Sequence, residues 1–161
     1  MGIFVRRGAL PITIGYLTSR PGTTVLQLAK QQRTHEWWDH QRSKYELVTS
    51  QLTIDEAGQG DPEAAVKRLD TLKPIPLLDV EHPDVKPLAD ELVIQHLLPE
   101  KAIEDARHVA VSAIFETDYL LTWNCKHIAN AATLPRIYRT LRDLGYESPL
   151  IVTPEEFFED V

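Results

Sequence analysis

The stretch that decides the fold is PEKAIEDARHVAVSAIFETDYLLTWNCKHIAN, residues 99–130. Its first half carries apolar residues at helical spacing and begins with Pro99, which suits the first turn of a helix. The short apolar run Tyr119–Leu121 is typical of a buried strand, and the polar segment Thr122–His127 follows it. Sites in open α/β sheets form beyond the carboxyl ends of strands. We therefore expect Asp105, near the helix start, to share a crevice with that polar segment.

The alternation of helix and strand patterns continues on both sides of this stretch. Strands are predicted near residues 3–5, 12–14, 47–49, 75–80 and 149–152. Helices are predicted near residues 23–38, 51–56, 61–72, 84–98 and 134–144, with a short terminal helix after 153. Such alternation favours the α/β class, with a parallel sheet covered on both faces.

The apolar pattern also predicts which side chains are buried. Val25 and Leu28, with Ala29, are expected to face the core from the helix that Thr23 caps. Val66, Leu69 and Leu72 are expected to form the buried side of the helix after Asp61. The adjacent Trp37 and Trp38 are expected to form a core and rim pair. Arg136, Arg139 and Arg142 are expected to point away from the core and to be available to anionic partners.

Composition limits the class of protein. The 161 residues, 43% hydrophobic and 25% charged, are expected to form a single domain, residues 1–161. No apolar run approaches the roughly 18 residues of a membrane span, and the one cysteine excludes an internal disulfide, so we expect a cytoplasmic protein without a membrane partner. The net charge of −7 argues against binding nucleic acid through the whole surface. The glycine-rich phosphate-binding motifs are absent from the sequence.

Several short motifs, in this order, resemble the PIN-domain family, in particular the VapC-like toxin ribonucleases. They are IDE at 54–56 with GDP at 60–62, EDARHVA at 104–110 and YLLTWNCKH at 119–127, together with GYLTSRP at 15–21. The resemblance implies a three-layer α/β/α sandwich with a central parallel sheet. It also implies metal-dependent cleavage of RNA, with carboxylates holding Mg²⁺ or Mn²⁺. These ions prefer oxygen ligands and keep waters that can attack a phosphodiester.

The resemblance assigns roles to individual residues. Glu56 and Asp105 match the family's second and third acids and are the implied metal ligands, whose mutual repulsion a cation would relieve. Asn124 and His127 lie where other members carry further acids, and they complete the implied catalytic set. The implied substrate contacts are Lys101, Thr122 and Lys126.

The sequence departs from the family pattern at its first acid. That position falls on Arg6 or Leu10, and the first acidic residue of the chain is Glu36. Three interpretations stay open: an active nuclease with fewer metal ligands, a degenerate PIN domain that binds RNA or a protein without cutting, or residues 1–15 that differ from the native N-terminus. For the active form, the resemblance implies a homodimer neutralised by an antitoxin protein.

Overall fold

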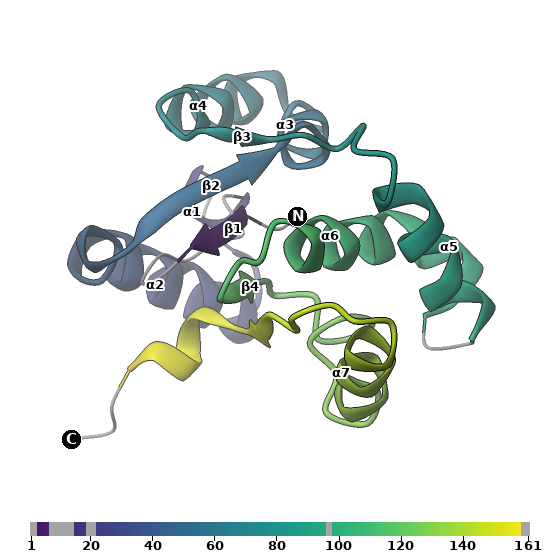
Figure 1. The fold of residues 1–161 in the computed structure, drawn as a ribbon. Helices are drawn as coiled ribbons and strands as arrows, with labels where there is room; N and C mark the ends of the chain where they lie inside the picture. The colour runs from purple at the N-terminus through teal and green to yellow at the C-terminus, as the bar shows by residue number, and fades with distance from the viewer. Residues whose placement is uncertain (1–2, 7–14, 19–21, 96–97, 159–161) are drawn as a thin grey trace.

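A five-stranded sheet lies at the centre of the computed structural model, which describes residues 3–6, 15–18, 22–95 and 98–158 (Figure 1). The strand order is β3-β2-β1-β4-β5. The strands are β1 (Ile3–Arg6), β2 (Glu46–Ser50), β3 (Leu77–Leu78), β4 (Tyr119–Leu121) and β5 (Leu150–Val152). The strand predicted over 75–80 is therefore shorter than expected, and the one predicted over 12–14 lies outside the described residues.

The sheet is mixed, which corrects the prediction of a fully parallel sheet. β2 and β3 are parallel, as are β4 and β5. The central strand β1 is antiparallel to both neighbours, with Phe4 opposite Val48 on one side and Leu120 on the other. A short apolar run has the same pattern whichever way the strand runs, so the sequence identified β1 as a strand but could not orient it.

Seven α-helices and three short 3₁₀ helices connect the strands in the described residues. The α-helices are α1 (Gly15–Thr18), α2 (Val25–His40), α3 (Gln51–Ala57), α4 (Pro62–Leu72), α5 (Val85–Ile94), α6 (Ile103–Ile114) and α7 (Leu134–Asp143). The 3₁₀ helices are η1 (Arg42–Lys44), η2 (Glu100–Ala102) and η3 (Pro154–Phe157). None of the helices within these described ranges is long and apolar enough to cross a membrane.

Local signals explain where several helices begin and end. The Asp61 carboxylate accepts a hydrogen bond from the Ala64 N–H at 2.9 Å, and Pro62 follows as the first helical residue of α4. Thr24, one residue after the predicted cap, caps α2. Pro99 precedes η2, so α6 itself begins only at Ile103. Gly145 follows the end of α7 with φ of 86°, a conformation that glycine adopts without strain.

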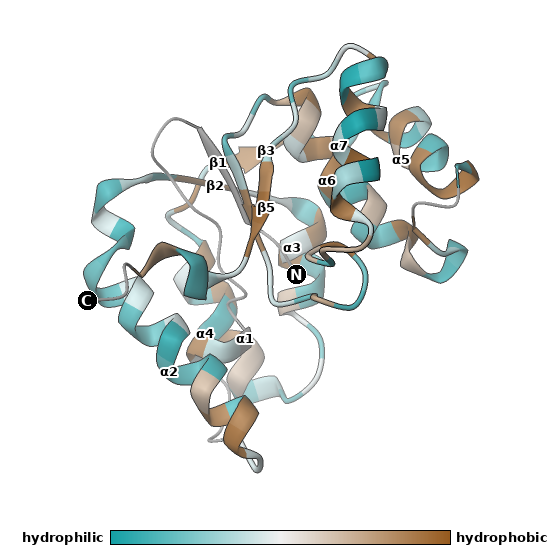
Figure 2. Ribbon diagram, turned by 90° about the horizontal axis from the view of Figure 1, so that it is seen from below, coloured by the Kyte–Doolittle hydropathy of each residue, from teal (hydrophilic) through white to brown (hydrophobic). Residues whose placement is uncertain are grey.

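Two apolar clusters cover the two faces of the sheet. Leu120 of β4 packs into a cluster with residues of α5, α6 and α7. The next residue, Leu121, packs into a second cluster with Trp37 of α2 and Leu72 of α4. Successive side chains of a strand point to opposite faces, so helices lie on both sides of the strands (Figure 2). Trp37 is fully buried and Trp38 only partly, which confirms the predicted core and rim pair.

The burial predictions for parts of α2 and α4 are wrong. Val25, Leu28 and Val66 are 86%, 46% and 57% exposed, and Ala29 is exposed as well. In α4, the buried Arg68 side chain donates to the carbonyl oxygens of Ala57 and Gln59 at 2.7 and 2.5 Å. These bonds satisfy carbonyl groups at the end of α3 and turn the Arg68 side of α4 inward, which leaves Val66, two residues away, on the outer side.

Candidate functional site

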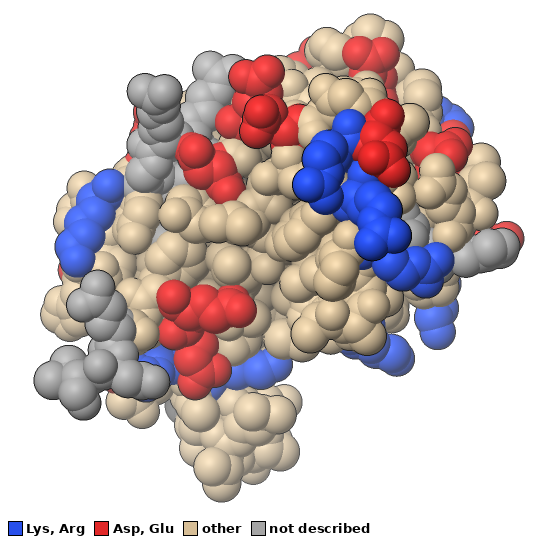
Figure 3. Space-filling view, turned by 60° about the horizontal axis from the view of Figure 1, so that its bottom comes forward, with Lys and Arg blue, Asp and Glu red and all other residues tan. Residues whose placement is uncertain are grey.

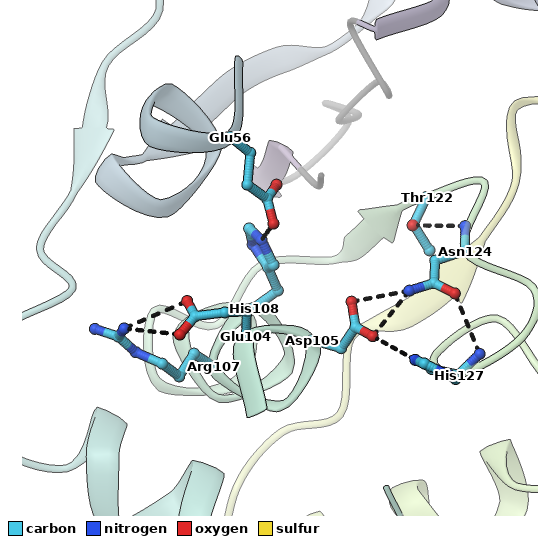
Figure 4. A network of polar contacts seen from close by, with 8 residues as sticks. All are labelled: Glu56, Glu104, Asp105, Arg107, His108, Thr122, Asn124 and His127. Carbon is cyan, nitrogen blue, oxygen red and sulfur yellow. Dashed lines mark hydrogen bonds and ion pairs between the residues drawn. The ribbon is translucent and has the colours of Figure 1, made fainter. Parts of the chain in front are cut away.

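The loop after β4 is held in a fixed shape by its own polar groups. The Thr122 hydroxyl accepts a hydrogen bond from the Asn124 N–H at 3.0 Å, and the Asn124 side-chain oxygen accepts one from the His127 N–H at 3.2 Å. The buried Trp123 indole N–H donates to the Thr34 hydroxyl of α2 at 3.0 Å. These contacts turn the Asn124 and His127 side chains toward the first turn of α6 (Figure 4).

Asp105, on that first turn, accepts hydrogen bonds from both side chains. The Asn124 amide nitrogen lies 2.9 Å from each carboxylate oxygen of Asp105. His127 Nδ1 lies 2.9 Å from Oδ2 of the same carboxylate, and the Asp105 and His127 side chains are only 14% and 18% exposed. The predicted proximity of Asp105 and the polar loop is therefore confirmed. Hydrogen bonds to a charged acceptor are stronger than neutral ones, so this group is well fixed.

Glu56 lies on α3 and contacts a different residue of α6. Its Oε1 is 3.3 Å from Nε2 of His108, whose side chain is fully buried, while the Glu56 side chain is 30% exposed. Burial acts to raise the pKa of Glu56, but hydrogen bonds and electrostatic attraction, of which those from His108 are the largest, outweigh it and lower the pKa from 4.5 to about 2. Glu56 is therefore ionised at neutral pH.

Helix α6 links the two carboxylates through different partners. Asp105 and His108 are three residues apart and lie on neighbouring positions of the helix surface, so one helix contacts Glu56 on one side and the β4–α7 loop on the other (Figure 4). The sequence led us to expect two acids facing and repelling each other. Instead, each acid is paired with a histidine. Sequence reasoning assigned His108 no role in the site, although its three-residue spacing places it beside Asp105 on the helix.

Glu56 and Asp105 are the right type of ligand for a cation that prefers oxygen, but they are few. Glu56 and Asp105 supply carboxylate oxygens of the type that Mg²⁺ and Mn²⁺ bind. Within the described residues, however, no group of three or more Asp, Glu, His and Cys side chains is arranged to hold a metal ion. A cation at Asp105 would replace hydrogen bonds that Asn124 and His127 now donate. A cation bound by these two carboxylates would therefore have to take most of its ligands from water.

The remaining sequence candidates differ in exposure. Lys101 on η2 and Lys126 in the loop are exposed, and the ammonium group of neither has a hydrogen-bond or ion-pair partner among the residues that the structure describes. Thr122 is fully buried, so its hydroxyl shapes the loop and does not face a substrate. Of the two positions where the family's first acid would fall, Arg6 lies in β1 opposite Glu46, and Leu10 lies outside the described residues.

Comparison of the chain with protein-family models, with curated proteins and with solved structures found no match. The resemblance to PIN domains therefore depends on the sequence motifs alone. What the structure adds is the arrangement of the residues that those motifs select.

Proposed function

We propose that this chain is a PIN-like, metal-dependent ribonuclease with a three-layer α/β/α fold. The observation that carries the proposal is the contact of Asp105 with Asn124 and His127, three residues that the family resemblance selects and that come from two separate segments. Glu56, the other acid that the resemblance selects, contacts the same helix, α6, through His108.

Each of these residues has a chemical role in the proposed reaction. Asp105 and Glu56 would hold Mg²⁺ or Mn²⁺, which would activate a water molecule and neutralise charge on the phosphodiester when bound. Asn124 and His127 hold the Asp105 carboxylate in one orientation. Lys101 and Lys126 are exposed cations that would contact the RNA backbone.

A second candidate is a PIN-like domain that binds RNA or a protein without cutting. The observation that favours it is the pairing of both carboxylates with histidines, together with the lack of a three-ligand metal group in the described ranges. Fewer carboxylates mean weaker attraction for a divalent cation.

Cleavage of a mixed RNA pool in Mn²⁺ separates the two candidates. If the chain is a ribonuclease, cleavage should need Mn²⁺ and should be lost in Asp105→Asn. It should be retained in Asp143→Asn, a control that removes an exposed acid. Two further variants, Arg6→Glu and Leu10→Glu, restore an acid at each possible first position, and activity should rise in one of them. If the proteins bind RNA but none of them cleaves it, the second candidate, a domain that binds without cutting, is supported.

The resemblance also leads us to propose a homodimer, an antitoxin partner and a cytoplasmic location. Light scattering on the purified chain measures the oligomeric state directly. Co-expression with the protein encoded beside it, followed by co-purification, tests the antitoxin.

A further inference from the structure

The arginines of α7 differ from the other arginines of the chain. Seven arginine side chains lie in the parts whose side chains the structure describes. Arg33 and Arg107 pair with glutamates, Arg42 lies over the Trp38 ring, and Arg68 binds backbone carbonyls. The other three are Arg136, Arg139 and Arg142 of α7, which are exposed and have no hydrogen-bond, ion-pair or ring partner among the described residues.

Unpaired arginines are unexpected on a protein with 24 acidic residues and 17 lysines and arginines. An exposed guanidinium without an acid beside it keeps all five N–H donors available, in a planar arrangement that matches phosphate oxygens. Three of them on one helix form a basic surface on an otherwise acidic chain. Figure 3 shows this as a band of basic side chains across the face where α7 lies.

The geometry of α7 aligns the three side chains. They repeat every third residue, so each step advances about 4.5 Å along the helix and turns about 60° around it. The opposite side of α7, with Ile137, Thr140 and Leu141, is buried in the core. The arginines therefore form one row on the outer surface.

This row begins beside the candidate site. The Thr133 hydroxyl, just before α7, donates to the His127 carbonyl at 3.5 Å, and the Thr133 N–H donates to the Asn130 carbonyl at 2.9 Å. The loop that carries Asn124 and His127 thus packs against the start of α7.

A shallow pocket of about 390 Å³ lies at the other end of the row. It is lined by Tyr138, Arg142, Tyr146, Glu147 and Ser148. Its walls are already fixed, because the Tyr138 hydroxyl accepts a hydrogen bond from the Ile151 N–H at 2.9 Å and the Ser148 hydroxyl donates to the Tyr138 carbonyl at 3.2 Å. Two aromatic rings are suited to a nucleobase, and the Glu147 carboxylate can accept hydrogen bonds from base amino groups while it repels phosphate.

We propose that α7 is the docking surface for single-stranded RNA, with phosphates on Arg136, Arg139 and Arg142 and one base in the pocket between Tyr138 and Tyr146. The inference deepens the proposed function, since it takes RNA as the ligand of the Asp105 site. A single strand is required because the bases of a duplex are not free to enter a side pocket. An acidic protein segment fits less well, because it has no base to place against Tyr138 and Tyr146 in the pocket.

The salt dependence of RNA binding tests the arginine row. The probe is a fluorescein-labelled 12-nucleotide RNA of mixed sequence, measured by anisotropy in EDTA so that no cleavage occurs. For single strands, each lost phosphate contact makes the slope of log K against log salt shallower by about 0.7. The triple variant Arg136→Gln, Arg139→Gln, Arg142→Gln should therefore lose about 2 from the slope.

The matched control removes three exposed cations elsewhere: Lys44→Gln, Lys67→Gln and Lys73→Gln. It has the same net charge as the arginine variant and should keep the original slope. An equal loss of slope in both triple variants, or no loss in the arginine variant, would overturn the proposal. Because the changes are on the surface, both variants should keep the melting temperature of the unmodified chain.

A change at Tyr146 tests the base pocket separately. Tyr146→Ala should weaken RNA binding roughly 5- to 100-fold, as loss of one base–aromatic stack does, and should leave the salt slope unchanged. Tyr146→Leu, which keeps apolar volume, guards against misfolding and should also weaken binding. Unchanged affinity in both variants would remove the base pocket from the proposal.

Three further outcomes identify which conclusion has failed. If the arginine variant loses affinity for polyglutamate but keeps its RNA affinity and slope, α7 takes an acidic protein and the proposal is wrong. If the unmodified chain binds RNA through α7 but never cleaves it, the docking surface stands and the ribonuclease is wrong. If the arginine variant still cleaves RNA and its binding keeps the salt slope of the unmodified chain, the ribonuclease stands and α7 is not the docking surface.

Discussion

Replacement of Glu56 by Gln should reveal how much the ionised carboxylate beside His108 stabilises the fold. The pKa of Glu56 falls from 4.5 to about 2 in the folded chain. Each factor of ten in proton affinity corresponds to about 1.4 kcal/mol, so the charged form contributes about 3 kcal/mol to the free energy of unfolding at neutral pH. Glutamine keeps the shape of the side chain but removes this charge.

The sign of the effect follows from the direction of the shift. A carboxyl group whose pKa is lowered by folding stabilises the protein above its unfolded pKa, here about 4.5, and that stability is lost as the pH falls toward about 2. The difference between the unmodified chain and Glu56→Gln should therefore be about 3 kcal/mol at pH 7 and only about 1.4 kcal/mol at pH 3. At pH 7 this corresponds to a melting temperature roughly 6–12 °C lower for the variant.

Urea unfolding followed by circular dichroism at pH 3, 4, 5 and 7 measures this difference. Glu81→Gln, which removes an exposed carboxylate, is the control and should change the free energy of unfolding by less than about 0.5 kcal/mol at each pH. A difference for Glu56→Gln that stays constant from pH 3 to pH 7 would refute the reasoning, because it would show that the ionised form is not what His108 stabilises.

Three further changes test other contacts of the structure. Asp105→Asn should lower the free energy of unfolding at pH 7 by about 1–3 kcal/mol, because the Asn124 and His127 N–H groups lose a charged acceptor. The same variant should abolish any rise in melting temperature caused by Mn²⁺. A variant that is more stable in urea than the unmodified chain would contradict this. Thr34→Val removes the hydroxyl that accepts from Trp123 and should cost about 1 kcal/mol in the same assay, with a shift in tryptophan fluorescence; equal stability would show that this bond contributes nothing. Leu120→Ala empties space in the fully buried centre of the sheet and should cost about 2–5 kcal/mol by thermal and urea unfolding; a loss below 1 kcal/mol would mean that the site collapses around the smaller residue.

The predicted stability loss in Asp105→Asn reverses what the sequence alone led us to expect. Two acids assigned to one crevice imply repulsion, and removing one charge would then stabilise the chain. In the structure, Asp105 accepts from Asn124 and His127, so its charge is compensated by donors. Burial and partners decide the sign of a charge effect, and neither can be read from the spacing of residues along the chain.

The sequence by itself determined the order of the main elements and the contact between Asp105 and the loop after β4. Helical spacing after Pro99, the apolar run Tyr119–Leu121 and the polar loop behind it were enough to bring Asp105, Asn124 and His127 together. These signals are local, since they depend on periodicity, on caps and on the ends of strands. The outward direction of the α7 arginines followed from the same periodicity and is confirmed.

Only the tertiary structure decided the direction of β1, the outer position of Val66 and the pairing of Glu56 with His108. Each depends on a partner far away in the chain. The strand β1 pairs with the strands of Val48 and Leu120, and Arg68 of α4 binds carbonyl groups at the end of α3. Glu56 contacts α6. An apolar pattern predicts that one face of a helix or strand is buried, but it does not predict which segment of the chain covers that face. Long-range contacts make that choice because they satisfy buried polar groups that no local pattern accounts for.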